Sequence, residues 1–123
     1  MTSDSAGIVL AGDSQYHTLM QIPGLVTSRT YVTGPNPMAV AVGADNQLAL
    51  GAQSPSGSDN DVFGYEQTAD QASWTYDFGM RPTAYNDVAP RGLAFAAGNA
   101  RLYAVVTDND GSDPVLHTLV PTP

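Results

Sequence analysis

The sequence predicts an all-β protein built from a short antiparallel unit that recurs about every fifty residues. The first observation is a repeated phrase, S-x-T-Y-x-x-G, which occupies residues 28–34 and again residues 73–79. The second is a longer echo, in which PMAVAVGADNQLALGA from Pro37 is matched by PRGLAFAAGNARLYAVV from Pro90. The third is the absence of any sustained apolar stripe of helical period. We therefore expect strands throughout the chain.

The best strand pattern is SWTYDF, in which Trp74, Tyr76 and Phe78 alternate with Thr75 and Asp77. Successive side chains of a strand point to opposite faces, so the three aromatic residues are expected to share a face. Clusters of Gly, Asn, Asp, Ser and Pro separate such segments and predict tight turns.

Each unit is expected to contain up to four strands, labelled A to D. A further echo, His17-Thr18-Leu19 with His117-Thr118-Leu119, helps to align the first and last units. The predicted order is BCD, ABCD, ABC, and the expected strands are about 7–12, 16–22 and 27–33, then 38–43, 47–52, 62–67 and 73–78, then 91–96, 101–107 and 115–120.

Four antiparallel strands every fifty residues or so, without helices, are typical of β-propeller blades. The blades are predicted at about 6–34, 37–79 and 90–121, within a single domain spanning residues 1–123. Propellers usually close with about four to eight blades, so we expect a partial ring or a ring completed by oligomerisation. In strand A, small residues are expected at the crowded axis and larger ones between blades: Ala39, Ala41, Gly92 and Ala94 against Val40, Val42, Leu93 and Phe95.

The segments TYVTGPNPMAVAVGADNQLALGA and YDFG…APRGLAFAAGNARLYAVV resemble the YVTN/NHL-type propeller repeats of bacterial secreted and surface proteins. They also resemble the propeller region of actinobacterial secreted proteins in which such blades precede immunoglobulin-like repeats. The resemblance covers about residues 28–120, with Ala39 in place of the motif's glycine and Gly98-Asn99 in place of its Asp-Gly turn. It implies a secreted or cell-surface location within a larger precursor, and no common catalytic set.

Composition excludes several classes of function. Twelve acidic residues face four arginines, and the net charge of −8 argues against nucleic acid and anionic membranes as partners. Without cysteine, disulfides and thiolate metal sites are excluded. No apolar run approaches the roughly twenty residues of a membrane-spanning helix, and no signal peptide is visible.

Most acidic residues are expected on one rim of the blades, at Asp13, Asp59, Asp61, Asp87, Asp108, Asp110 and Asp113. The DNDGSD stretch resembles the start of a calcium loop, so Asp108, Asp110, Ser112 and Asp113 are candidate Ca²⁺ ligands. The alternative is ordinary solvated turns, which the same residue types favour. No other cofactor is expected.

Candidate ligand contacts come from the long connector after residue 79, where Tyr85, Asn86 and Asp87 lie, because long loops on a rigid scaffold carry function. Trp74 is a second candidate, as a carbohydrate platform, although an aromatic residue on a strand also serves as filler between blades.

A competing enzymatic hypothesis begins with GIVLAGDSQ, which resembles the nucleophile block of GDS-type esterases and would make Ser14 the nucleophile. That family has an Asp-x-x-His motif, whereas Asp113 and His117 are separated by three residues. The sequence also shows no helical pattern, although the fold of that family requires several helices. The alternative is a hairpin with Asp13-Ser14 at its turn.

The sequence thus favours a non-catalytic binding or structural propeller module that recognises its ligand, a glycan or a protein, through rim loops. The first alternative is an oligomeric propeller lectin with glycan sites between blades, and the second is the esterase. Its expected structural partners are further copies of the chain or the remainder of a larger propeller.

Overall fold

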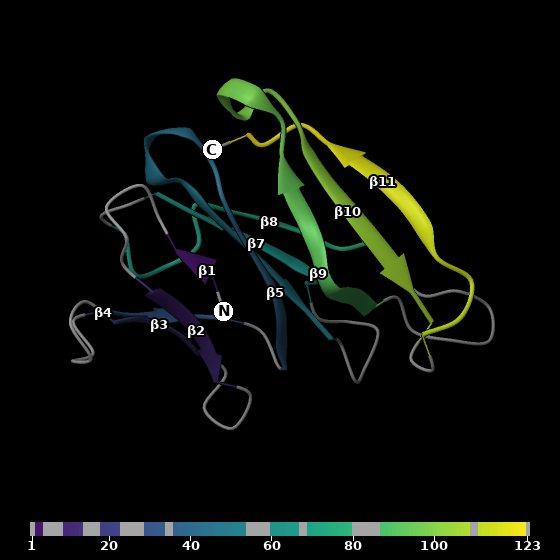
Figure 1. Ribbon diagram of the computed structural model, residues 1–123, viewed down its shortest axis with the longest axis horizontal. Coiled ribbons are helices and arrows are strands. Elements are labelled where there is room, and N and C mark those ends of the chain that lie inside the picture. Colours follow the sequence, from purple (N-terminus) through teal and green to yellow (C-terminus); the bar gives the residue numbers. More distant parts are fainter. Residues whose placement is uncertain are drawn as a thin grey trace.

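The computed structural model describes residues 2–3, 9–13, 18–22, 29–33, 36–53, 60–66, 69–79, 87–108 and 111–122. Among them, regular structure consists of strands and two short 3₁₀ turns, and every pair of neighbouring strands is antiparallel (Figure 1). The all-β prediction is confirmed. The strands form three separate sheets, which do not close into a ring within the described residues.

The first sheet has the order β1-β2-β3-β4. Its strands are β1 (Thr2–Ser3), β2 (Val9–Asp13), β3 (Thr18–Ile22) and β4 (Arg29–Val32). The predicted three-strand order BCD was wrong here, because β1 pairs with β2 in the place of strand A. Two residues are too short to show a strand period, which is why the sequence pattern missed them.

The second and third sheets follow the predicted ABCD and ABC orders. The second contains β5 (Pro37–Val42), β6 (Leu48–Ala52), β7 (Val62–Tyr65) and β8 (Trp74–Tyr76). The third contains β9 (Asp87–Phe95), β10 (Leu102–Thr107) and β11 (Val115–Leu119), in the order β11-β10-β9. Strand β9 begins earlier than predicted, because its pairing with β10 resumes beyond an irregularity and reaches Asp87.

The ladders place repeated residues at equivalent positions. Val42 lies opposite Leu48 in the second sheet, and Phe95 lies opposite Leu102 in the third. The same logic relates the fourth strands of the first two sheets, because Tyr31 lies opposite Leu19 and Tyr76 opposite Val62. The S-x-T-Y phrases are therefore equivalent outer strands.

The third sequence echo was misaligned. Val9 and Leu102 are equivalent, because each begins the second strand of its sheet. Val9 lies opposite Ile22 and Leu102 lies opposite Leu119. Leu119 is therefore equivalent to Ile22 and not to Leu19. His17 itself lies outside the described residues. A three-residue echo carries too little information to fix a register.

The second sheet is covered on both faces (Figure 1). The core against the third sheet includes residues of β5, β6, β7, β9, β10 and β11, namely Ala39, Ala41, Ala49, Val62, Val88, Leu93, Leu102, Ala104, Val106 and Leu119. The core on the opposite face contains Tyr31, Leu48, Leu50, Ala52 and Tyr65. Ala39 and Ala41 thus belong to an inter-sheet core, and their predicted role at an axis was wrong, since neighbouring sheets cover both faces of β5.

Tyr65 links the first two sheets. Its ring meets that of Tyr31 edge-on, with centroids 5.3 Å apart, and its hydroxyl donates a hydrogen bond to the Val32 carbonyl oxygen at 2.6 Å. A buried phenol needs such an acceptor, so Tyr65 fixes the position of β4 against the second sheet.

A hairpin latch links the second and third sheets. The Asn99 side chain accepts a hydrogen bond from Ala44 N (2.6 Å) and donates to the Ala44 carbonyl oxygen (2.8 Å) and to Gln47 Oε1 (3.1 Å). Gly43 is required beside it, because an added Cβ would collide with the Asn99 amide. This latch joins the turns between β5 and β6 and between β9 and β10.

Candidate functional site

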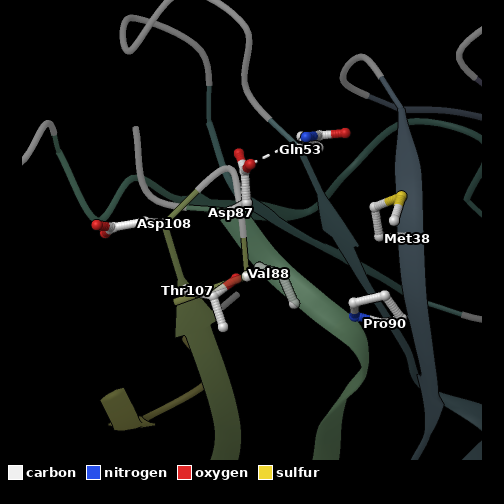
Figure 2. Close-up of a pocket in the computed structure, with 8 residues that line it drawn as sticks. Met38, Gln53, Asp87, Val88, Pro90, Thr107 and Asp108 are labelled. Atoms are coloured by element: carbon white, nitrogen blue, oxygen red, sulfur yellow. Dashed lines mark hydrogen bonds between the residues drawn. The ribbon is translucent and has the colours of Figure 1, made fainter. Parts of the chain in front are cut away.

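A pocket of about 230 Å³ lies between the second and third sheets (Figure 2). It sits where β5 and β9 begin and where β6 and β10 end. Its lining residues are Met38, Gln53, Asp87, Val88, Pro90, Thr107, Asp108 and Gly111. Drug-sized ligand pockets typically measure about 300–1,000 Å³, so this one suits a single sugar ring or side chain.

The polar side of the pocket is formed by Gln53 and Asp87, thirty-four residues apart in the chain. An isolated bridge joins their backbones across the two sheets, and Gln53 Nε2 donates a hydrogen bond to Asp87 Oδ2 at 3.0 Å (Figure 2). Asp87 is only 5% exposed. The inter-sheet bridge thus fixes the orientation of a buried carboxylate at the edge of the pocket.

The opposite side is apolar. Met38 is 40% exposed, Pro90 is exposed and Val88 is buried, and Figure 2 shows Met38 and Pro90 across the opening from Asp87. A few fixed polar groups facing an apolar wall are the usual arrangement of a small binding site. Carboxylate and hydroxyl oxygens here suit a ligand that offers hydrogen-bond donors next to a hydrocarbon surface.

Only part of the predicted calcium group lies in this pocket. Asp108 lines it, but Figure 2 shows its carboxylate pointing away from Asp87. The backbone closes a turn here, because Asp108 N donates to the Ser112 carbonyl oxygen (3.0 Å) and Gly111 N to the Asp108 carbonyl oxygen (2.8 Å). Asp113 is exposed with φ 47°, and Asp110 lies outside the described residues. Within the described part of the chain, no three carboxylate or imidazole side chains gather in a metal-binding group.

The predicted ligand contacts separate in space. Asp87 lines the pocket just described, while Tyr85 and Asn86 lie outside the described residues. Trp74 lies at the opposite ends of the strands and lines a second pocket of about 270 Å³, between the same two sheets. The other residues of that pocket are Asp45, Gln47, Tyr65, Glu66, Ser73, Gly98, Asn99 and Pro121.

Trp74 is half-buried and packs against the core between the second and third sheets. Its ring lies directly over Gly64, its neighbour across β7 and β8, where any side chain would collide with it. These contacts support the interpretation that Trp74 fills space between the second and third sheets. Trp74 also lines the second pocket.

Asp61 was expected among the acids of the rim, but its carboxylate is buried. It is 2% exposed, and Asp61 Oδ2 accepts a hydrogen bond from Phe78 N at 2.6 Å. Burial raises the pKa of Asp61 from its ordinary value of 3.8 to about 7; the Phe78 hydrogen bond opposes the rise, and Asp77 and Asp87 add to it. The sequence neighbourhood of Asp61 resembles a solvated turn, so nothing local indicated this environment.

The esterase hypothesis falls largely outside the described residues, which exclude Ser14. The strands that flank it, β2 and β3, form an antiparallel pair in which Asp13 lies opposite Thr18. His117 contacts the Phe78 ring, with centroids 4.5 Å apart. These contacts fit the hairpin interpretation of the segment and a packing role for His117.

No helix among the described residues is long and apolar enough to cross a membrane. Comparisons with protein-family models, with curated proteins and with solved structures found no match.

Proposed function

We propose that the chain is a non-catalytic binding or structural module of β-propeller type, belonging to a secreted bacterial surface protein, and that it recognises its ligand at the rim between its second and third sheets. The observation that carries the proposal is the rim pocket, in which the Gln53–Asp87 pair from two sheets faces an apolar wall. This arrangement supplies recognition chemistry from strand ends.

The propeller part of the proposal is supported by the sheets themselves. Three successive antiparallel meanders follow one another in the chain, and equivalent ladder positions recur from sheet to sheet. Each interface buries apolar residues from both partners. Blades of a propeller stack in this manner, each contacting only its neighbours.

A ligand of matched chemistry would present hydroxyl, amide or cationic donors to Asp87 and a hydrocarbon edge to Met38 and Pro90. A sugar ring has both features, as does an exposed peptide side chain with a polar end. The proposal includes Ca²⁺ as a further ligand of the rim, and Asp108 is the predicted Ca²⁺ ligand that lines this pocket.

The lectin alternative is favoured by a separate observation, the Trp74 pocket. Its aromatic edge lies beside Asp45, Glu66 and Asn99, and sugar-binding sites commonly combine such groups because the ring's apolar face stacks while its hydroxyls bond to oxygens. The two pockets lie at opposite strand ends, so they are separable by mutation.

The direct test is an amide chemical-shift titration of the ¹⁵N-labelled chain with a panel of monosaccharides, lysine and arginine amides, and CaCl₂. The proposal expects at least one probe to shift Gln53, Asp87 and Thr107 in a saturable manner. Shifts at Trp74 and Glu66 alone would instead favour the lectin alternative. If no probe perturbs either set, rim recognition is wrong.

The matched variants are Asp87→Asn and Asp45→Asn. Asp87→Asn retains side-chain size but removes the charge of the Asp87 carboxylate, and should weaken binding there by about tenfold or more, since one good charged hydrogen bond is worth about 1.5–3 kcal/mol. Asp45→Asn, at the other strand ends, should leave that binding unchanged. Equal effects of both changes would contradict a specific site at Asp87.

A further inference from the structure

The third sheet differs from its neighbours at its outer edge. The first two sheets each contain four strands, and the third contains three described strands, with β11 at its end. Within the described residues, β11 pairs with β10 alone. No other described strand pairs with the far side of β11.

Exposed apolar side chains lie at both ends of this edge. Leu116 is 65% exposed, Val115 is 43% exposed and Val120 is 59% exposed. From Pro114 to Pro123 the sequence contains no Asp, Glu, Lys or Arg. Proteins usually protect an open strand edge with charged residues, proline, a covering loop or very short strands. β11 has five residues with neither a charge nor a proline, although Pro114 precedes it and Pro121 follows it.

The ladders indicate which strand belongs at this edge. In the first two sheets the neighbouring strand is the S-x-T-Y phrase, whose tyrosine lies opposite Leu19 in one sheet and Val62 in the other. Leu116 occupies the corresponding position, because it precedes Leu119 by three residues, as Val62 precedes Tyr65.

The backbone at this edge is also equivalent. Thr118 occupies the place of Gly64, whose carbonyl oxygen accepts a hydrogen bond from Ser73 N at 2.7 Å on the fourth-strand side. A strand added beside β11 would find the same type of acceptor at Thr118.

We propose that the open edge of β11 binds an extended S-x-T-Y segment by antiparallel strand addition, with its tyrosine opposite Leu116 and its threonine opposite His117. Backbone hydrogen bonds provide most of the affinity in this mode, and side-chain positions provide the specificity. The inference depends on sheet topology, so it is independent of ligand binding at the rim.

The β11 strand of a second copy fits this edge less well. Pairing β11 with β11 about a twofold axis at His117 would place Leu116 opposite Thr118 and leave it without an aromatic neighbour. It would also bring together two chains that each carry a net charge of −8, and like net charges oppose association.

The experiment uses a fluorescein-labelled peptide with the sequence QASWTYDFG, residues 71–79, titrated with the full chain while fluorescence anisotropy is recorded. Binding should be saturable, with a Kd of about 10–100 µM. A Tyr76→Ala peptide should bind several-fold more weakly, because Leu116 loses its neighbour.

Two protein variants locate the site. Thr118→Pro removes an edge N–H and Leu116→Glu places a charge opposite the tyrosine, and each should weaken binding by at least about tenfold. Thr122→Pro, exposed and beyond β11, is the matched control and should bind as the parent chain does. Thermal melting followed by circular dichroism shows whether each variant is folded. If Thr118→Pro does not fold, Leu116→Glu alone tests the site.

Three results would overturn the proposal: equal binding of a scrambled peptide, unchanged binding by Leu116→Glu, or no saturable binding at all. The chain could instead fail to bind the peptide and form a dimer in sedimentation. If Leu116→Glu abolishes that dimer, the edge pairs with a second copy of the chain.

Discussion

The second and third sheets share a ladder pattern but differ in their surroundings. Val62 and Leu116 occupy equivalent positions, yet Val62 is fully buried and Leu116 is 65% exposed. The second sheet packs against a neighbouring sheet on each face and has a fourth strand beside β7. Among the described residues, the third sheet packs against a neighbouring sheet on one face alone and has no fourth strand beside β11. In a repeated structure the burial of a residue thus depends on its neighbouring units as much as on its own sequence.

The largest expected effect comes from a core truncation in the better covered sheet. Leu50 is fully buried between the first and second sheets, so Leu50→Ala should lower the free energy of unfolding by about 2–5 kcal/mol. Leu116→Ala, at the exposed edge, should change it by less than about 0.5 kcal/mol. Urea unfolding measures both. Similar losses for the two variants would contradict the difference between the sheets.

A pH-dependent effect of about 1–3 kcal/mol is expected from Asp61. The folded state holds the Asp61 proton up to a pKa of about 7, while the unfolded state releases it near 3.8. Asp61 therefore contributes stability that is present below pH 4, is lost as the pH rises to 7, and is constant above that.

Asp61→Asn tests this directly, because its amide oxygen can still accept the Phe78 N–H. The difference in unfolding free energy between variant and parent should grow in favour of the variant from pH 4 to 7. Asp45→Asn, at an exposed position, serves as the control. A difference that does not change with pH would show that Asp61 ionises normally.

A smaller effect, about 1–2 kcal/mol, is expected from the hairpin latch. Asn99→Gly retains the left-handed backbone at φ 58° but removes the three side-chain hydrogen bonds. Gly43→Ala should be destabilising because its Cβ meets the Asn99 amide, and this cost should shrink in the Asn99→Gly background. Additive losses in the double variant would mean that the two residues do not interact.

Features of the fold that depend on local pattern were predictable, and those that depend on distant contacts were not. Turn residues and alternation located the strands of the second and third sheets, and the repeated phrases identified Tyr31 and Tyr76 as equivalent. The two-residue β1 left no pattern. Ala39 and Ala41 of β5 were expected at an axis but lie in the core against the third sheet, because strand A alone does not reveal which neighbour covers each face.

The candidate site shows the same limit. Asp87 was expected in a long connector, whereas the structure places it at the start of β9, where it lines a pocket; its contact with a ligand stays a prediction. Its partner Gln53 was missed because the pair is thirty-four residues apart and belongs to two sheets. The burial of Asp61 was missed because a carboxylate beside Asn60 looks like a solvated turn residue, and its hydrogen-bond donor, Phe78 N, is seventeen residues away in the sequence.

The most direct test of the difference between the sheets is residue-resolved hydrogen exchange of the backbone amides. Amides of β6, covered on both faces, should exchange at least about a hundredfold more slowly than those of β11, and adding the QASWTYDFG peptide should slow β11 selectively. Protection of β11 equal to that of β6 in the free chain would contradict the claim that the third sheet has an open edge.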